Sequence, residues 1–247
     1  MTLAERDVAE EPSGVSFSTS PLAHGTAMLR LLQISSSTLP VGSFAYSNGL
    51  ESLVELGQIV GEESLVKYLT TLLLGSLGLL DLPRLLRMHR AFAAGNLEEA
   101  GRHSAWLYAS RESFEFQAQE RQTASALVKI LAALDALEST SHLDEKWQPK
   151  TYAEAYAFAA VAFDIEEHNC LLGYAFVWAE SHTSAAAKLL SLGPLAVQRV
   201  LSALLTRLGA VVKSAYSVSD SDIGSAAPGL GIASARHETQ YCRLFRS

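Results

Sequence analysis

The chain has 247 residues, of which 49% are hydrophobic and 18% are charged, and its formal net charge is −7. This composition predicts a compact globular body rather than a disordered chain, and the length is enough for one sizeable core. The negative charge argues against nucleic acid as the main partner.

The cysteines and the apolar stretches indicate a cytoplasmic protein. Cys170 and Cys242 lie far apart and form no Cys-x-x-Cys pair, so a disulfide scaffold is not expected and a reducing compartment fits. The first residues, Met1 to Glu11, are acidic and lack the apolar segment of a secretory signal. The longest uncharged apolar stretch, Tyr68 to Leu80, is too short to span a bilayer.

The first half of the chain predicts short helices separated by glycine and proline. An amphipathic helix ends in the run Ser35 to Thr38, and Pro40 and Gly42 then turn the chain. Ser43 is expected to cap a following helix that contains Gly49. Further helices are expected at Glu62 to Leu80, Leu85 to Ala94 and Leu97 to Ser110, with breaks at Asp81-Leu82-Pro83 and Gly95-Asn96.

The second half predicts longer helices. One runs from about Arg111 past Leu137, and two more fill the alanine-rich stretch Tyr152 to Leu190, which we expect at the centre of a bundle. Pro194 suits the first turn of another helix. That helix carries an apolar stripe at 4-3-4-3 spacing: Val197, Leu201, Leu204, Leu208 and Val211.

The predicted fold is all-α, a single-domain helical bundle of roughly eight to ten helices with a flexible C-terminal tail. The predicted boundaries are a flexible N-terminal segment at 1–24, the helical domain at 25–217, and a partner-binding tail at 218–247. No internal repeat is present.

The tail differs from the body in composition. A Ser/Gly/Pro-rich connector, Ser217 to Ser234, leads to a terminal segment, Arg236 to Ser247, with three arginines and one acid. Tyr241, Leu244 and Phe245 lie there at i, i+3 and i+4. Such a segment suits ordering on another surface. Composition alone leaves a second arrangement equally open, in which the tail folds back on its own domain.

Catalytic and metal-binding motifs are weak. The chain contains no GxxxxGK[ST] phosphate loop and no GxSxG nucleophile elbow. The pairs Asp164/His168 and Glu99/His103 have i, i+4 spacing, but a stable metal site needs more converging ligands. We therefore expect no catalytic residues, no metal site and no cofactor bound by the chain itself.

Three blocks of the sequence, in order, resemble one family. They are Leu31-Leu32-Gln33 with Leu39-Pro40-Val41-Gly42 and Tyr46-Ser47-Asn48-Gly49-Leu50-Glu51; Trp178 through Ala185-Ala186-Ala187-Lys188 to Gln198-Arg199; and the closing Arg236-His237-Glu238 with Arg243-Leu244-Phe245-Arg246-Ser247. Together they resemble the urease accessory protein UreF family from about Leu29 to the end of the chain.

The resemblance implies a non-enzymatic, homodimeric chaperone of urease maturation. It implies that the protein joins the scaffold UreD (also called UreH) and the GTPase UreG, and regulates GTP-dependent nickel insertion into apo-urease. Nickel and GTP would be handled by these partners. The matching positions assign Glu51, Lys188, Tyr46 and Gly42 to a GTPase-facing surface. They assign the following to a scaffold-binding tail: Arg236, His237, Tyr241, Arg243, Leu244, Phe245 and Arg246.

The sequence departs from the family where Ser191-Leu192-Gly193-Pro194 stands in place of the usual Pro-Leu-Gly-Gln. This shift weakens any inference about contacts made by that loop. An alternative function is a helical small-molecule-binding protein or enzyme with a pocket near Tyr46, Glu51 and His168. The spacing of these residues assembles no nucleophile, base and orienting group.

Overall fold

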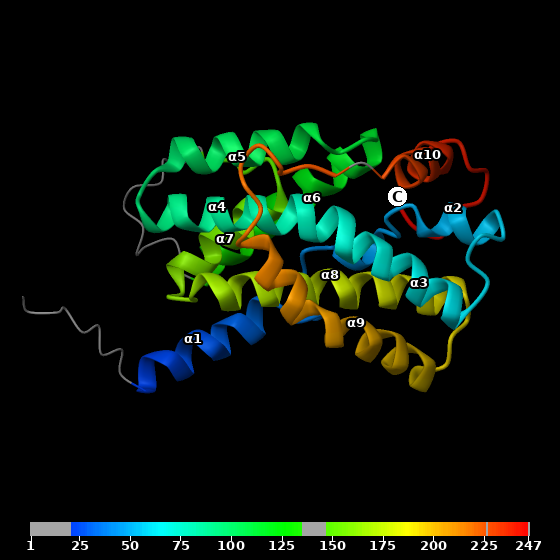
Figure 1. The fold of residues 1–247 in the computed structure, drawn as a ribbon, viewed down its shortest axis with the longest axis horizontal. Helices are drawn as coiled ribbons and strands as arrows, with labels where there is room; N and C mark the ends of the chain where they lie inside the picture. Colours follow the sequence, from blue (N-terminus) through cyan, green and yellow to red (C-terminus); the bar gives the residue numbers. More distant parts are fainter. Residues whose placement is uncertain (1–20, 135–146, 226, 247) are drawn as a thin grey trace, which may run out of the picture.

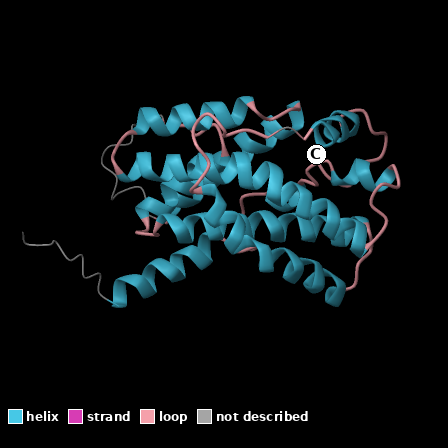
Figure 2. Cartoon of the chain, in the orientation of Figure 1, coloured by secondary structure: helices cyan, strands magenta, loops and turns pink. Residues whose placement is uncertain are grey.

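A computed structural model describes residues 21–134, 147–225 and 227–246. The described chain is built from packed helices and contains no strand within those ranges, so the all-α prediction is confirmed (Figures 1 and 2). Most of the predicted N-terminal segment, and residues 135–137 of the predicted long helix, lie outside the described residues.

The elements follow one another along the chain with short connections. They are α1 (Pro21–Ile34), the 3₁₀ turn η1 (Ser43–Ala45), α2 (Leu50–Glu55), α3 (Glu62–Leu72), the π-helical η2 (Leu73–Asp81), α4 (Leu82–Ala93), α5 (Leu97–Ala109), α6 (Phe114–Ala133), α7 (Tyr152–Ala162), α8 (Glu167–Leu189), α9 (Pro194–Ala215) and α10 (Pro228–His237).

Local signals set several helix ends as predicted. Gly95 adopts a left-handed conformation after α4, with φ of 71°. The Asn96 side chain then accepts the Glu99 N–H and caps α5. Pro194 occupies the first turn of α9, and Leu204, Leu208 and Val211 of the predicted stripe are buried.

The alanine-rich helix α7 lies at the centre of the bundle, as predicted, and packs against α4, α6 and α8. Its alanines at 153, 155, 157, 159 and 160 are fully buried. Small side chains let neighbouring helices approach closely. Gly173 of α8 marks the tightest approach, because a Cβ there would lie 2.5 Å from both Leu31 Cδ1 and Tyr156 Oη.

The predicted break at Asp81-Leu82-Pro83 is wrong, because α3, η2 and α4 form one continuous helical stretch. Proline lacks an N–H, so the carbonyl four residues earlier loses its usual donor. That carbonyl, Leu79 O, accepts the Gly224 N–H at 3.1 Å instead. The widened π-helical turns of η2 end where Leu82 N–H reaches Leu77 O. A distant segment therefore supplies the bond that proline cannot make.

The segment after Pro40 also differs from the prediction. Ser43 begins a short 3₁₀ turn and caps no α-helix, and Tyr46 is extended. The helix starts only at Leu50, after Asn48 and Gly49, both of which have positive φ. A Cβ on Gly49 would lie 3.1 Å from Leu230 Cδ1. Glycine is thus needed here for the turn and for the approach of α10.

The tail adopts the second of the two arrangements that its composition left open. It is folded back on the domain: α10 packs on α2 and α6 at one end of the molecule, and the C-terminus lies beside them (Figure 1). Ala233 and Phe245 belong to a second, smaller core shared with α2, α3, α8 and α9. The structure thus replaces the predicted flexible tail with a docked one, because burial of these side chains offsets the entropy of ordering.

Two stretches, 62–93 and Pro194–Ala215, are long and apolar enough to cross a membrane by length and composition alone. In the structure they pack against each other and against α8. Of the residues in the most apolar window of each stretch, 50% are buried in the first and 28% in the second.

The close packing around Gly173 predicts a clear mutational asymmetry. Gly173→Ala should destabilise the fold by about 1–3 kcal/mol, because the added methyl group displaces Tyr156 and Leu31. Gly209→Ala is the matched control, since it also lies inside a helix but has no atom within 4 Å of the added Cβ. It should stabilise by up to about 1 kcal/mol through helix propensity. Urea unfolding followed by circular dichroism measures both, and equal effects of the two substitutions would contradict this packing.

Candidate functional site

Glu51 is the residue that holds the C-terminal tail on the domain. It lies in the first turn of α2 and is buried. The backbone N–H groups of Leu244 and Phe245 donate to its two carboxylate oxygens at 2.7 and 3.0 Å. His237 Nε2 lies 3.1 Å from Oε2 of the same carboxylate. Hydrogen bonds to a charged acceptor are stronger than neutral ones, so this one side chain fixes the path of residues 237–245.

A second carboxylate, that of Glu115 in the first turn of α6, contacts the other ring nitrogen of His237. The Nδ1 atom of His237 lies 2.9 and 3.1 Å from the two oxygens of Glu115, and the ring is fully buried. Arg243 donates to Glu115 at 3.3 Å. Burial raises the pKa of Glu115, while the charge and hydrogen bond of His237 oppose that shift. The tail therefore brings an imidazole and a guanidinium group to a pair of buried acids.

Apolar and backbone contacts anchor the last residues. Phe245 is buried in the smaller core, and the Lys188 ammonium lies 5.5 Å from the centre of its ring, within cation–π range. The Arg246 N–H donates to Ala45 O at 2.8 Å. The hydroxyls of Ser113 and Ser234 lie 2.7 Å apart and join α10 to the start of α6. We call Glu51, Glu115, Lys188, His237, Arg243 and Phe245 the tail-docking site.

A groove runs between the tail and α6, beside this site. The Tyr46 hydroxyl donates to Gln122 across it, and Gly42 turns the preceding loop with φ of 79°. The side chains that line the groove are Tyr46, Phe114, Glu115, Ala118, Gln122, Glu238, Arg243 and Arg246. Tyr241 and Leu244 project outward from the docked tail and are exposed.

The structure brings together residues that the sequence assigned to two different surfaces. Glu51, Lys188 and Tyr46 were predicted to face the GTPase, and His237, Arg243 and Phe245 to bind the scaffold, yet they meet around the docked tail. Arg236 is exposed on α10. Sequence analysis missed Glu115, which lies 122 positions from His237. No spacing rule links residues so far apart, so only the fold reveals this contact.

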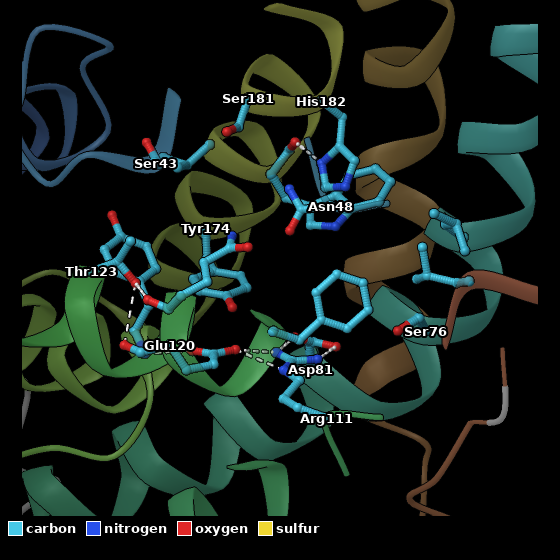
Figure 3. Close-up of a pocket in the computed structure, with 17 residues that line it drawn as sticks. Ser43, Asn48, Ser76, Asp81, Arg111, Glu120, Thr123, Tyr174, Ser181 and His182 are labelled. Atoms are coloured by element: carbon cyan, nitrogen blue, oxygen red, sulfur yellow. Dashed lines mark hydrogen bonds and ion pairs between the residues drawn. The ribbon is translucent and has the colours of Figure 1, made fainter. Parts of the chain in front are cut away.

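A cavity of about 130 Å³ lies nearby and is lined by residues of the loop before α2, of η2 and of the helices α6 and α8 (Figure 3). Arg111 lies on one side between Asp81 and Glu120. Burial alone would lower the pKa of Arg111, but the two carboxylates outweigh it and hold the pKa well above its ordinary value. Leu230 of α10 also lines the cavity, so the docked tail forms part of its wall.

On the opposite side of the cavity, His182 has a fixed tautomer. Its Nδ1 lies 2.8 Å from Trp178 O, a carbonyl that can only accept. Burial lowers the pKa of His182 to about 4, so the ring is neutral near pH 7 and Nε2 is an acceptor. The cavity therefore offers hydroxyl, amide and imidazole groups beside a charge-compensated arginine.

The alternative pocket near Tyr46, Glu51 and His168 does not exist in the described structure. His168 lies at the start of α8 and stacks near Tyr216. Lys188, which reaches the tail-docking site, lies 20 residues further along the same helix, which corresponds to about 30 Å. His168 and the tail-docking site, which contains Glu51 of α2, therefore lie at opposite ends of α8.

Neither predicted acid–histidine pair builds a metal site. His103 Nε2 lies 3.0 Å from Glu99, and Arg84 occupies Nδ1 at 3.0 Å. Burial and the neighbouring Arg84 lower the pKa of His103 to about 4. Within the described ranges, no group of three or more His, Cys, Asp or Glu side chains could hold a metal ion.

Comparison with known proteins identifies relatives over most of the chain. The model of the UreF family matches residues 59–205. The urease accessory protein UreF of Chromohalobacter salexigens is 39% identical over 221 residues, covering 90% of this chain and 95% of that protein. The UreF of Thermosynechococcus vestitus is 39% identical over 222 residues (90% and 98%), and that of Teredinibacter turnerae is 36% identical over 220 (89% and 98%).

The geometry around Glu51 predicts that its removal frees the tail. Glu51→Ala leaves two backbone N–H groups without their acceptor and leaves His237 in contact with Glu115 alone. A hydrogen bond to a charged group contributes about 1.5–3 kcal/mol. Trypsin cleavage after Arg236 and Arg243 should therefore accelerate on the order of tenfold or more, as followed by mass spectrometry. Glu55→Ala, an exposed acid on the same helix, is the control. An unchanged cleavage rate in Glu51→Ala would show that Glu51 does not hold the tail.

Proposed function

The chain belongs to the UreF family of urease accessory proteins, which serve urease maturation and are not enzymes, and on this premise we propose the finer function. The protein bridges the nickel scaffold UreD/UreH and the GTPase UreG, and regulates GTP-dependent nickel insertion into apo-urease. It does so as a cytoplasmic homodimer, without a membrane partner and without nucleic acid.

The observation that carries this proposal is the shared tail-docking site. Glu51, assigned to the GTPase-facing surface, accepts hydrogen bonds from the backbone of the tail assigned to the scaffold. A partner that binds the tail must either break the hydrogen bonds of Glu51 or stabilise them. Binding at one surface can then alter affinity at the other, because both share one set of contacts.

The two faces of the tail support separate roles. Phe245 and His237 point inward and hold the segment in place. Tyr241 and Leu244 point outward, and large exposed apolar side chains are typical of the centre of a protein–protein contact. The outward face is the part of the tail that a scaffold can bind while the inward face stays docked.

Nickel and GTP are assigned to the partner proteins. The sequence has no phosphate-binding loop of the GxxxxGK[ST] type. The described residues contain no cluster of three metal-ligating side chains. In this proposal the chain acts on nickel delivery by positioning its partners.

Substituting the outward face tests the scaffold contact. The double variant Tyr241→Ala, Leu244→Ala should reduce co-purification of UreD/UreH at least tenfold from cells that express all the urease proteins, since hot-spot side chains each contribute about 1–2 kcal/mol or more. Its melting temperature should stay within about 2 °C of wild type, because both side chains are exposed. Thr239→Ala, exposed on the same segment, is the control. Full co-purification by the double variant would remove the tail from the scaffold interface.

Lys188 provides a test of the other surface. Lys188→Ala should weaken recruitment of GTP-loaded UreG by about three- to tenfold and make it less dependent on salt concentration, because an exposed charge acts mainly on encounter and orientation and salt screens that attraction. Lys213→Ala, exposed in the last turn of α9, removes the same charge elsewhere. Surface plasmon resonance of the purified complex measures both variants. Equal affinities for wild type and Lys188→Ala would exclude this residue from the GTPase contact.

A further inference from the structure

The contacts of His237 require a particular number of protons. Its Nδ1 lies 2.9 Å from Glu115 and its Nε2 lies 3.1 Å from Glu51. Carboxylates accept hydrogen bonds, and a neutral imidazole carries one N–H, so it can satisfy only one of these contacts. The second contact is a hydrogen bond only if a second proton is present, on the ring or on one of the carboxyl groups.

The groups around the ring do not remove this requirement. Glu51 comes from α2 and Glu115 from α6, while Arg243 approaches Glu115 from the tail itself. The exposed Glu238 follows His237 in the chain and adds negative charge near Glu115. Lys188 of α8 faces the ring of Phe245. The arginine offsets one carboxylate but donates nothing to His237, so the proton count at the two ring nitrogens is unchanged.

We propose that docking of the C-terminal tail is a proton-controlled latch, in which the bound tail holds one proton at Glu51–His237–Glu115 that the free tail gives up above neutral pH. Docking is then strongest below about pH 6.5, the ordinary pKa of a free histidine, and weakens as pH rises further. At most, the equilibrium constant for docking falls about tenfold for each unit by which the pH rises. The latch depends only on residues of this chain and not on any partner.

The raised pKa of Glu115 is consistent with this latch. Burial is its main cause, and it favours retention of a proton within the cluster to higher pH than for an exposed glutamate. Interacting acids and a histidine titrate as one unit, so the proton belongs to the cluster rather than to a single residue. The burial of the ring also means that an unprotonated nitrogen facing a carboxylate has no water to separate the two.

Hydrogen exchange of the Leu244 and Phe245 amides tests the latch, because both donate to Glu51 only in the docked state. Protection factors, which are already corrected for the intrinsic pH dependence of exchange, should fall by up to tenfold per pH unit between pH 7 and 9 in the wild-type protein. Protection that stays constant over this range would overturn the proposal.

Glu115→Gln separates the latch from general loosening of the tail. The introduced amide can donate to Nδ1 of a neutral ring while its oxygen still accepts from Arg243, so docking no longer takes up a proton. Its protection factors should stay constant within about twofold from pH 7 to 9. Glu238→Gln removes a neighbouring charge without touching His237 and should keep the wild-type slope. A wild-type slope in Glu115→Gln would overturn the proposal.

A measurement on the wild-type protein keeps the test decisive if Glu115→Gln does not fold. The ¹³Cε1 resonance of His237 should change over the same pH interval in which the Leu244 amide loses protection, because the ring leaves the buried cluster when the tail is released. A resonance that stays constant while the Leu244 amide loses protection would overturn the latch.

Discussion

The structure depends at one end on a single buried acid. The Glu51 carboxylate accepts the N–H groups of Leu244 and Phe245 and contacts His237, and these contacts hold residues 237–245 on the domain. An acid buried without partners would be costly. Glu51 is tolerated in the first turn of a helix, where the macrodipole favours negative charge, because the tail supplies donors on its other side.

The position of this acid follows from the loop that precedes it. Asn48 and Gly49 both take positive φ, and α2 therefore begins at Leu50 with Glu51 facing α10. Leu230 packs on Gly49 and also lines the neighbouring cavity. The turn, the docked helix and the cavity wall are thus one structural unit. A larger residue at position 49 would strain the turn and push α10 away from the turn and from the cavity.

Much of the fold could be predicted because its signals are local. Each of these signals can be recognised from a few neighbouring residues: Gly95 ends α4 and Asn96 caps α5, Pro194 starts α9, and dense alanines mark α7. The errors arise where a distant group overrides local chemistry. Leu79 O is satisfied by Gly224, which lets Pro83 remain inside a helical stretch. The docked tail depends on Glu115, whose partner His237 lies 122 positions away. Composition described the tail correctly as cationic and aromatic, yet it could not show that the domain carries two buried acids to receive it.

The predicted GTPase-facing surface and the predicted scaffold-binding tail meet because Glu51 and Glu115 hold the tail. A tail that binds only through its outward residues, Tyr241 and Leu244, leaves Glu51 occupied, whereas a tail that is pulled away exposes Glu51 and Glu115 together. The exposed state then presents two acids and Lys188 in place of acids that are paired with groups of the tail. Since charge acts on association over about 8–10 Å at physiological ionic strength, the position of the tail changes what a partner meets on approach. A scaffold bound to the outer face would keep the acids covered, and one that needs Phe245 would uncover them.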